Sequence, residues 1–360
     1  MTSLISSAVT IDPAQVDWYQ QLQQLSYAFG KPEAQAILKQ SPEDFKVVEI
    51  MSIQTSGEGE HYWLDISKMK SNTDQIAKSL ARHANVAFRD VGYSGLKDFF
   101  ADTRQWFSVW MPHDANFDWQ SFSLPGVVVH QVVKHSRKIK RGTHSANQFE
   151  IVLRNVNVHK SDLESRLDKI KSLGVPNYFG SQRFGRNADN MRQAYAILVS
   201  GKKIKNRNLR GLMISSARSW MFNHLVSARV SAQNWSQLQA NEPANLSGSN
   251  SVFVTQGTQL EKQRLEAHDI HPTAPLWGDG HQQAMHSSLE LHRWECEQLQ
   301  GFKPLMQGLE NQRIDYQRRA LRAVPTGLKW RLDGENLAIK FQLSRGQFAT
   351  SILRELVNTR

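Results

Sequence analysis

Two short runs of the sequence combine residue types that could hold a planar base and react with it. Residues 95–98 read Gly-Leu-Lys-Asp, so a carboxylate follows a glycine turn and stands beside a cation. Residues 177–185 read Asn-Tyr-Phe-Gly-Ser-Gln-Arg-Phe-Gly, which brings amides, aromatic rings and a guanidinium together. A carboxylate on a turn can act as a nucleophile, and aromatic rings with amides can hold an unstacked base. Together the two runs predict a site that works on a base.

Each run also has a structural interpretation without catalysis. Asp98 could cap the turn or helix that follows it, as most aspartates after a glycine do. The three aromatic rings of 177–185 could belong to the core. However, polar side chains are rarely interleaved so densely in a core unless they have partners, as Asn177, Gln182 and Arg183 would need. Spacing alone leaves both interpretations open.

The charge balance favours a polyanionic partner. The chain has 360 residues with 44 Lys and Arg against 33 Asp and Glu, a net charge of +11. Two cationic runs, 134–142 and 202–210, concentrate part of this charge. Such runs are either solvated loops or contacts to the phosphates of a nucleic acid, independent of base sequence. We therefore expect a nucleic-acid partner, with the solvated loop as the alternative.

Several classes of protein lack support in the sequence. The single Cys296 cannot form an internal disulfide, and the thirteen histidines show no metal-ligand spacing. There is no glycine-rich phosphate loop and no apolar stretch long enough for a membrane helix. Residues 1–10 lack the basic start of a signal peptide. We expect a cytoplasmic protein with no metal, no cofactor, no membrane association and no obligate protein partner evident.

The pattern of apolar residues predicts an α+β fold with a mixed sheet. Strand-like alternation marks much of the chain up to residue 153 and returns near the end, whereas helical spacing begins near Asn72. Trp106 and Trp110 should lie on the opposite face of their strand from Phe107 and Val109. Residues 39–50 are predicted to form a Pro-led turn that feeds a strand. The further predicted strands are 61–66, 105–111, 127–133, 149–153, 329–332 and 337–341, and the predicted helices include 162–173 and 348–358.

A change of pattern predicts an inserted domain. Between residues 203 and 322 the pattern is mostly helical, broken by a Ser/Asn/Gly loop at 245–251 and by a Pro/Gly stretch at 271–280. Past Pro325 the strand pattern returns. We expect residues 1–202 and 323–360 to form one catalytic domain, with 203–322 inserted into it.

Five segments, in order, resemble the TruD family of tRNA pseudouridine synthases. They cover the chain from about Lys39 to its end, and five ordered matches are far more specific than any single run. The segments are Lys39 with Pro42-Glu43-Asp44-Phe45 and Glu49; 95–98 with Gln105-Trp106; 175–185; Ser216-Ala217-Arg218-Ser219 with Phe222-Asn223; and 346–351 with Arg354-Glu355-Leu356.

This resemblance implies a fold and a reaction. The fold would be a mixed-sheet pseudouridine-synthase catalytic domain with an inserted, mostly helical TRUD domain. The reaction would be isomerisation of uridine to pseudouridine in tRNA without a cofactor, at the thirteenth nucleotide in the D arm. A non-catalytic RNA-binding protein with the same basic and aromatic surface is the alternative.

The resemblance also implies roles for single residues. Asp98 matches the nucleophile, and Phe179 matches the aromatic that stands in for the tyrosine of other synthases. Phe45, Asn177 and Phe348 match positions that contact the uridine. For the cation that pairs with Asp98, Lys39 is the first choice by resemblance. Arg354 is the second, because an Arg on a helix could offer two parallel hydrogen bonds, whereas Lys97 should point away.

Overall fold

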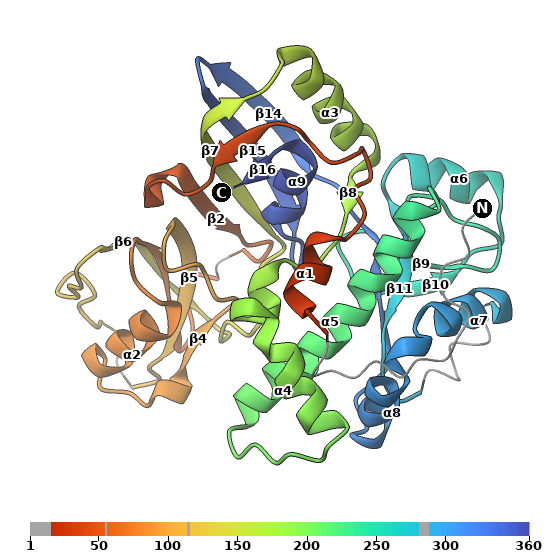
Figure 1. Cartoon of the computed structure of the whole chain (residues 1–360). Helices are drawn as coiled ribbons and strands as arrows, with labels where there is room; N and C mark the ends of the chain where they lie inside the picture. The colour runs from red at the N-terminus through yellow and green to blue at the C-terminus, as the bar shows by residue number, and fades with distance from the viewer. Residues whose placement is uncertain (1–15, 55, 114–115, 281–287, 360) are drawn as a thin grey trace. The chain divides into compact units, whose positions relative to one another are not determined.

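The computed structural model describes residues 16–54, 56–113, 116–280 and 288–359 (Figure 1). Residues 1–10, for which we expected no signal peptide, lie outside these ranges. The chain divides into two compact units. We call residues 32–171, 325–349 and 356–360 the sheet unit. The helix-rich unit comprises residues 1–31, 172–324 and 350–355.

The sheet unit is built on one ten-stranded mixed sheet. Its central path runs β14-β15-β7-β2-β5-β3-β6, with β1, β16 and β4 attached beside it. Most pairs are antiparallel, whereas β2–β5 and β1–β16 are parallel, so the expected mixed sheet is confirmed. The strands are β1 (Gln35–Ile37), β2 (Phe45–Ile50), β3 (His61–Lys68), β4 (Val91–Tyr93), β5 (Asp102–Trp110), β6 (Val127–His135), β7 (Ala146–Asn157), β14 (Thr326–Asp333), β15 (Asn336–Ser344) and β16 (Asn358–Thr359).

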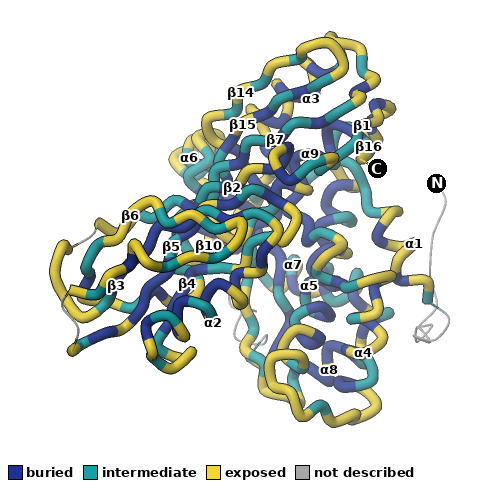
Figure 2. Tube along the Cα trace, turned by 90° about the vertical axis from the view of Figure 1, so that its left-hand side faces the viewer, coloured by how far each residue is buried: buried dark blue, intermediate teal, exposed yellow. Residues whose placement is uncertain are grey.

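Alternation of side chains along these strands separates the core from the solvent (Figure 2). On β5, Phe107 and Val109 are fully buried, whereas Trp110 on the other face is exposed, as predicted from the sequence. Helix α2 (Thr73–His83) covers the buried face, because Ile76 and Leu80 pack in one cluster with side chains of β3 and β5. Helix α3 (Lys160–Leu173) follows β7. The chain between α2 and β5 carries the 95–98 turn.

The helix-rich unit contains more strand than the sequence predicted. Its elements include a four-stranded sheet in the order β10-β9-β11-β12 and a short pair β13-β8. The helices are α1 (Trp18–Gln23), α4 (Asp189–Leu198), α5 (Arg207–Ser231), α6 (Gln259–Glu266), α7 (Leu289–Gln298), α8 (Lys303–Asn311) and α9 (Ala349–Leu356). The strands are β8 (Val175–Pro176), β9 (Pro243–Leu246), β10 (Val252–Val254), β11 (Ile270–Leu276), β12 (Gln317–Ala320) and β13 (Arg322–Ala323).

The Pro/Gly stretch at 271–280 does interrupt the helical pattern, but it does so as a strand that the sequence analysis did not predict. It contains most of β11, an inner strand of the four-stranded sheet, with Pro272 paired to Ala244 and Pro275 to Arg318. Proline cannot donate to a ladder, so a run with two prolines reads as a loop or an edge. Burial of the segment from Ile270 to Pro275 overrides that local signal.

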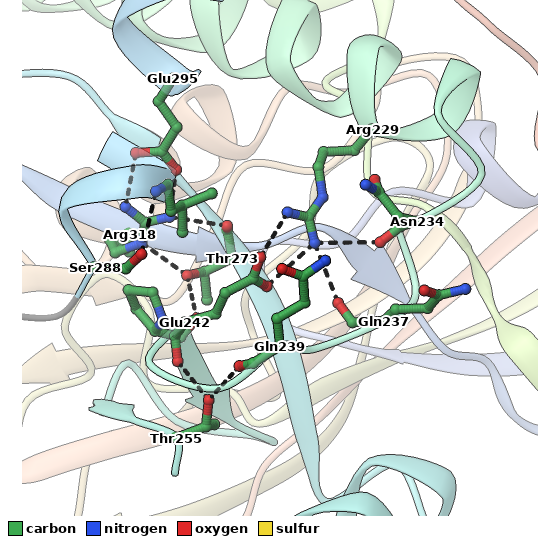
Figure 3. A network of polar contacts seen from close by, with 12 residues as sticks. Arg229, Asn234, Gln237, Gln239, Glu242, Thr255, Thr273, Ser288, Glu295 and Arg318 are labelled. Carbon is green, nitrogen blue, oxygen red and sulfur yellow. Dashed lines mark hydrogen bonds and ion pairs between the residues drawn. The ribbon is translucent and has the colours of Figure 1, made fainter. Parts of the chain in front are cut away.

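Two buried arginines tie the four-stranded sheet to its helices (Figure 3). Arg229 of α5 donates to Glu242 at 2.9 Å and to the carbonyls of Asn234 and Gln237. Arg318 of β12 donates to Glu295 of α7 at 2.6 Å and 3.1 Å. Removing one partner of such a buried pair leaves the other charge buried without compensation. These pairs therefore fix which helix packs on which part of the sheet.

The final strands rejoin the first part of the sheet, as expected. β14 pairs with β15, and β15 pairs with β7 over eight registered residues. The compact units change at residues 171/172 and 324/325, whereas we predicted domain limits at 202/203 and 322/323. A division into compact units does not test which segment is inserted into which domain, so the predicted boundaries stay a prediction.

Candidate functional site

The 95–98 turn presents the Asp98 carboxylate to a lysine from a distant part of the chain. Asp98 lies between β4 and β5, and its Oδ2 accepts a hydrogen bond from Lys39 Nζ. The Asp98 side chain keeps 37% exposure and that of Lys39 keeps 20%. The cation expected first from the sequence therefore does pair with Asp98. The carboxylate is ionically held, yet open enough to meet a substrate.

Lys39 is held in a backbone conformation that non-glycine residues rarely adopt. Its φ is +57°, in the left-handed region. The turn after it is fixed by Asp44, whose buried carboxylate accepts from Arg154 of β7 at 2.6 Å and from the Ser41 amide at 3.1 Å. Burial tends to raise the pKa of Asp44, but these hydrogen bonds lower the pKa below its usual value overall. Strain kept at a fixed loop is typical of a functional position.

Three buried groups clamp the backbone of the Asp98 turn. Gln105 Nε2 donates to the carbonyl of Gly95 at 3.1 Å, and the Lys97 amide donates to Thr73 Oγ1 at 3.1 Å. Lys68 Nζ donates to the carbonyl of Asp98 at 2.7 Å. These bonds come from β5, α2 and β3, so the sheet and its helix together set the position of the carboxylate.

Lys97 points away from Asp98, as the sequence analysis expected. Its Nζ donates to Glu49 Oε2 at 2.8 Å, and both side chains are almost entirely buried. Burial raises the pKa of Glu49, while the charge and hydrogen bond of Lys97 lower it in part. His144 lies 3.9 Å from the same carboxylate, and burial together with the Lys97 charge lowers the pKa of His144 to about 4. The buried Lys97–Glu49 ion pair therefore helps to hold the 95–98 turn in place.

Lys68 is a component of the site that the sequence did not reveal. It ends β3 and is 1% exposed. Burial lowers its pKa from 10.5 to about 8, with the Asp98 charge opposing and Lys97 reinforcing the shift. Lys68 continues the apolar face of β3 that Leu64 and Ile66 form. A lysine at such a position is the signal that could have found it, because a buried ammonium needs an acceptor.

Phe45 and Phe348 occupy different surroundings within the sheet unit. Phe45 is 5% exposed, packs edge-on against Phe149 at 6.2 Å, and carries Lys39 Nζ 4.1 Å above its ring. The structure thus brings Lys39, Phe45 and Asp98 together. Phe348 is half-buried and directly precedes α9.

The aromatic run 177–185 belongs to the helix-rich unit. Tyr178, Phe179 and Phe184 are all buried, as the structural interpretation required. Phe184 packs edge-on against Trp220 at 5.4 Å. Asn223 brackets the backbone of Phe179, since its amide accepts from the Phe179 amide at 2.8 Å and donates to its carbonyl at 2.9 Å. The run is therefore held rigidly from α5.

Arg319 organises the two predicted uridine-binding residues of this run. Its guanidinium donates to Asn177 Oδ1 at 2.8 Å and lies 4.2 Å above the Phe179 ring. Burial lowers the pKa of Arg319 to about 9, and the nearby Arg183 charge adds to this effect. Asn177 is 2% exposed and also donates to the carbonyl of Ala320 at 2.9 Å. The sequence analysis did not name Arg319; its position next to Arg318 on a strand, where neighbours face opposite ways, was the available signal.

Arg354 contacts the beginning of its own unit. Its guanidinium lies 3.5 Å from the centre of the Tyr27 ring and donates to the carbonyls of Leu25 and Ser26, the latter at 3.1 Å. It also approaches Glu355 at 3.4 Å. These contacts hold residues 25–27 against α9. The role of Arg354 as a catalytic residue stays a prediction.

The two cationic runs differ in structure. In 134–142, Arg141 stacks 4.1 Å above Tyr93 and donates to its hydroxyl at 2.7 Å, while Ile139 is buried. Arg137 and Lys140 are exposed. The run 202–210 is largely exposed and leads into α5, whose N-cap is Asn206. Exposed cations on a fixed segment suit contact with phosphates.

Two classes of site find no match in the described part of the chain. Among these residues, no group of three or more His, Cys, Asp or Glu side chains could hold a metal ion. None of the helices within the described ranges is long and apolar enough to cross a membrane.

The fold itself is that of a known class of protein. The structure superposes on a crystal structure of a protein named tRNA pseudouridine synthase D (TruD) from Methanosarcina mazei, with a TM-score of 0.68. The match covers 95% of this chain and 98% of that one at 18% sequence identity. The α+β fold with a mixed sheet is thus shared with that protein.

Sequence comparisons define the family. The family model described as tRNA pseudouridine synthase D (TruD) matches residues 21–203 and 200–356. A tRNA pseudouridine synthase D from Proteus mirabilis is 40% identical over 339 residues, covering 93% of this chain and 96% of that protein. Its counterpart from Nitrosococcus oceani is 40% identical over 341 residues, covering 94% of each. The chain belongs to the TruD family of tRNA pseudouridine synthases. It is therefore an enzyme of the isomerase class.

Proposed function

We propose that the chain converts the uridine at the thirteenth nucleotide of tRNA, in the D arm, to pseudouridine, with Asp98 as nucleophile and without a cofactor. Family membership supports the class of reaction. The single observation that carries the residue assignment is the Asp98 carboxylate, held by Lys39 on a clamped turn and still 37% exposed. The cytoplasm is the compartment that suits such an enzyme.

The reaction needs what this turn offers. The N-glycosidic bond of uridine breaks, the released uracil rotates, and a carbon–carbon bond forms to the same sugar, so substrate and product have the same atoms. A carboxylate can add to the nucleotide or assist the elimination, and it is regenerated when the new bond closes. No atom is oxidised from outside and no water is consumed, so the balance requires neither a redox cofactor nor a hydrolytic metal.

Lys39 is the proposed partner of Asp98 during this cycle. Its ammonium contacts Asp98 Oδ2 and lies above the Phe45 ring, so its position is fixed from two sides. A fixed cation stabilises the carboxylate when it leaves the sugar. Arg354 is the weaker candidate, because its guanidinium already contacts Tyr27 and two backbone carbonyls.

We propose that Phe45, Asn177, Phe179 and Phe348 contact the uridine. Phe179 and Asn177 are held by Arg319 and Asn223 in the helix-rich unit, and a fixed aromatic ring can stack on a base removed from its helix. The side-chain amide of Asn177 uses one N–H and one lone pair in these contacts, so its second N–H and second lone pair are the groups that would meet uracil. We further propose residues 203–322 as the inserted module that grips the tRNA backbone.

The test is incubation of the purified chain with an unmodified tRNA transcript, after dialysis against a chelator, followed by pseudouridine mapping. We expect product at the thirteenth nucleotide and none in a transcript with cytidine there. Asp98→Asn keeps the size and polarity of the side chain but removes the charge, and should abolish product while leaving tRNA affinity unchanged. The matched control is Asp102→Asn, an acid four positions on that only approaches Lys46 at 3.9 Å.

Two outcomes would overturn the proposal. Turnover of Asp98→Asn above roughly a tenth of wild type is a barrier change of only ~1.4 kcal/mol, too small for the loss of a nucleophile. Tight tRNA binding by the wild-type chain with no product at any uridine would favour the non-catalytic RNA-binding alternative.

A further inference from the structure

The residues that flank Asp98 expose large apolar side chains. Leu96 is 64% exposed, Phe99 is 49% exposed and Phe100 is 40% exposed. In the part of the chain that the structure describes, only one further phenylalanine, Phe88, is exposed. Single exposed apolar residues are ordinary, but a group of them around one reactive carboxylate indicates a contact surface.

This exposure is built into the turn. The Gly95 and Asp98 carbonyls accept from Gln105 and Lys68, and the Lys97 amide donates to Thr73. On the far side, Ala101 is fully buried. A backbone pinned at both ends presents its exposed side chains in a fixed place, so binding to them costs little ordering entropy.

The position of these side chains points to the occupant. Adjacent Cα atoms are about 3.8 Å apart, so the exposed Phe99 ring leaves the backbone directly beside the residue whose carboxylate would meet the sugar. Extruding one nucleotide from a stack uncovers the faces of the bases beside it. An exposed aromatic ring at that place can cover such a face.

The neighbouring charges favour RNA over an apolar protein segment. An open depression of about 430 Å³ is lined by Leu96, Lys97 and one side of α2, including the cations Lys78 and Arg82. Asp74, the acid in this lining, accepts a hydrogen bond from the Tyr93 hydroxyl. Apolar surface beside cations suits a base and its phosphate.

We propose that Phe99 and Phe100, with Leu96 on the other side of Asp98, form a stacking surface for the base next to the target uridine. The inference rests on the proposed function and deepens it: the same turn that carries the nucleophile also keeps the flanking base from closing back over the gap. Phe99 and Phe100 are thus positioning residues, which bind a nucleotide that does not react.

The experiment uses tRNA transcripts with 2-aminopurine on either side of the thirteenth nucleotide, because stacking on an aromatic ring quenches its fluorescence. Binding is measured in the Asp98→Asn background, so the result does not depend on turnover. We expect quenching with Phe99 and Phe100 intact, and loss of quenching with about tenfold weaker binding when both are changed to alanine. Phe99→Tyr should retain the signal. Phe88→Ala, which removes a similarly exposed ring elsewhere in the sheet unit, should leave it unchanged.

A second arm tests stacking itself. With an abasic site at the flanking nucleotide, wild type and the double alanine variant should bind equally, because neither protein can then stack on a base at that position. Binding of the double variant within twofold of wild type with undiminished quenching overturns the proposal, as does an equal loss on abasic and normal RNA. Absence of pseudouridine with the wild-type chain would instead refute the proposed function, independently of these binding results.

Discussion

Lys68→Met tests how the buried ammonium beneath Asp98 affects folding. The wild-type lysine is 1% exposed, and burial lowers its pKa from 10.5 to about 8. At ~1.4 kcal/mol per pKa unit, keeping this group charged in the folded state costs on the order of 3 kcal/mol at neutral pH. Methionine removes that cost but leaves the Asp98 carbonyl without its hydrogen bond, a loss of ~1–3 kcal/mol. We expect the two proteins to have similar stability at pH 7.

The pH dependence makes this prediction sharp. Between pH 8 and pH 10.5 the unfolded chain holds the Lys68 proton and the folded chain releases it. The free energy of unfolding of wild type should therefore rise with pH in this window, relative to Lys68→Met. The total gain should approach the ~3 kcal/mol cost that deprotonation relieves.

Urea denaturation at several pH values measures the difference between the two proteins. The difference between their free energies of unfolding cancels the contributions of the other titrating groups. Lys78→Met, which removes an exposed lysine of α2, reports the effect of losing one surface charge. A difference between wild type and Lys68→Met that stays constant across the window, or that shrinks with pH, refutes the reasoning.

Three further predictions concern the helix-rich unit and the tRNA. Phe179→Ala should destabilise the fold by ~3–5 kcal/mol, since the ring is 6% exposed. Turnover is therefore measured with Phe179→Leu, which fills more of the space and for which we expect a strong fall in kcat. A folded Phe179→Leu protein with wild-type kcat would assign the ring to the core alone. Arg319→Lys removes the planar guanidinium that contacts Asn177 and covers the Phe179 ring. This change should lower kcat about tenfold, while thermal denaturation should show intact folding. Unchanged kinetics would contradict a positioning role for Arg319. The affinity for tRNA should weaken steeply with salt in a titration from 50 to 200 mM, and less steeply after Arg137→Ala with Lys140→Ala; a flat salt response would count against phosphate contacts.

Local periodicity determined most of the sheet unit. Alternation on β5 placed Phe107 and Val109 inside and Trp110 outside, and the return of strand pattern after Pro325 indicated that β14 and β15 rejoin the first strands. Such patterns survive because one face of each strand must be buried whatever its partners are. The strand β11 was missed because its two prolines carry a local signal that burial overrides.

The sequence also predicted the reactive carboxylate of the site and its cation, but not the buried residues that hold the site in place. The order of its motifs indicated the family and singled out Asp98, and resemblance named Lys39 as its partner, 59 positions away. The local signals at Lys68 and Arg319 did not single them out, because their importance comes from burial against acceptors distant in sequence, Asp98 and Asn177. A side chain's type is written in the sequence, whereas its desolvation and its partner exist only once the chain has folded.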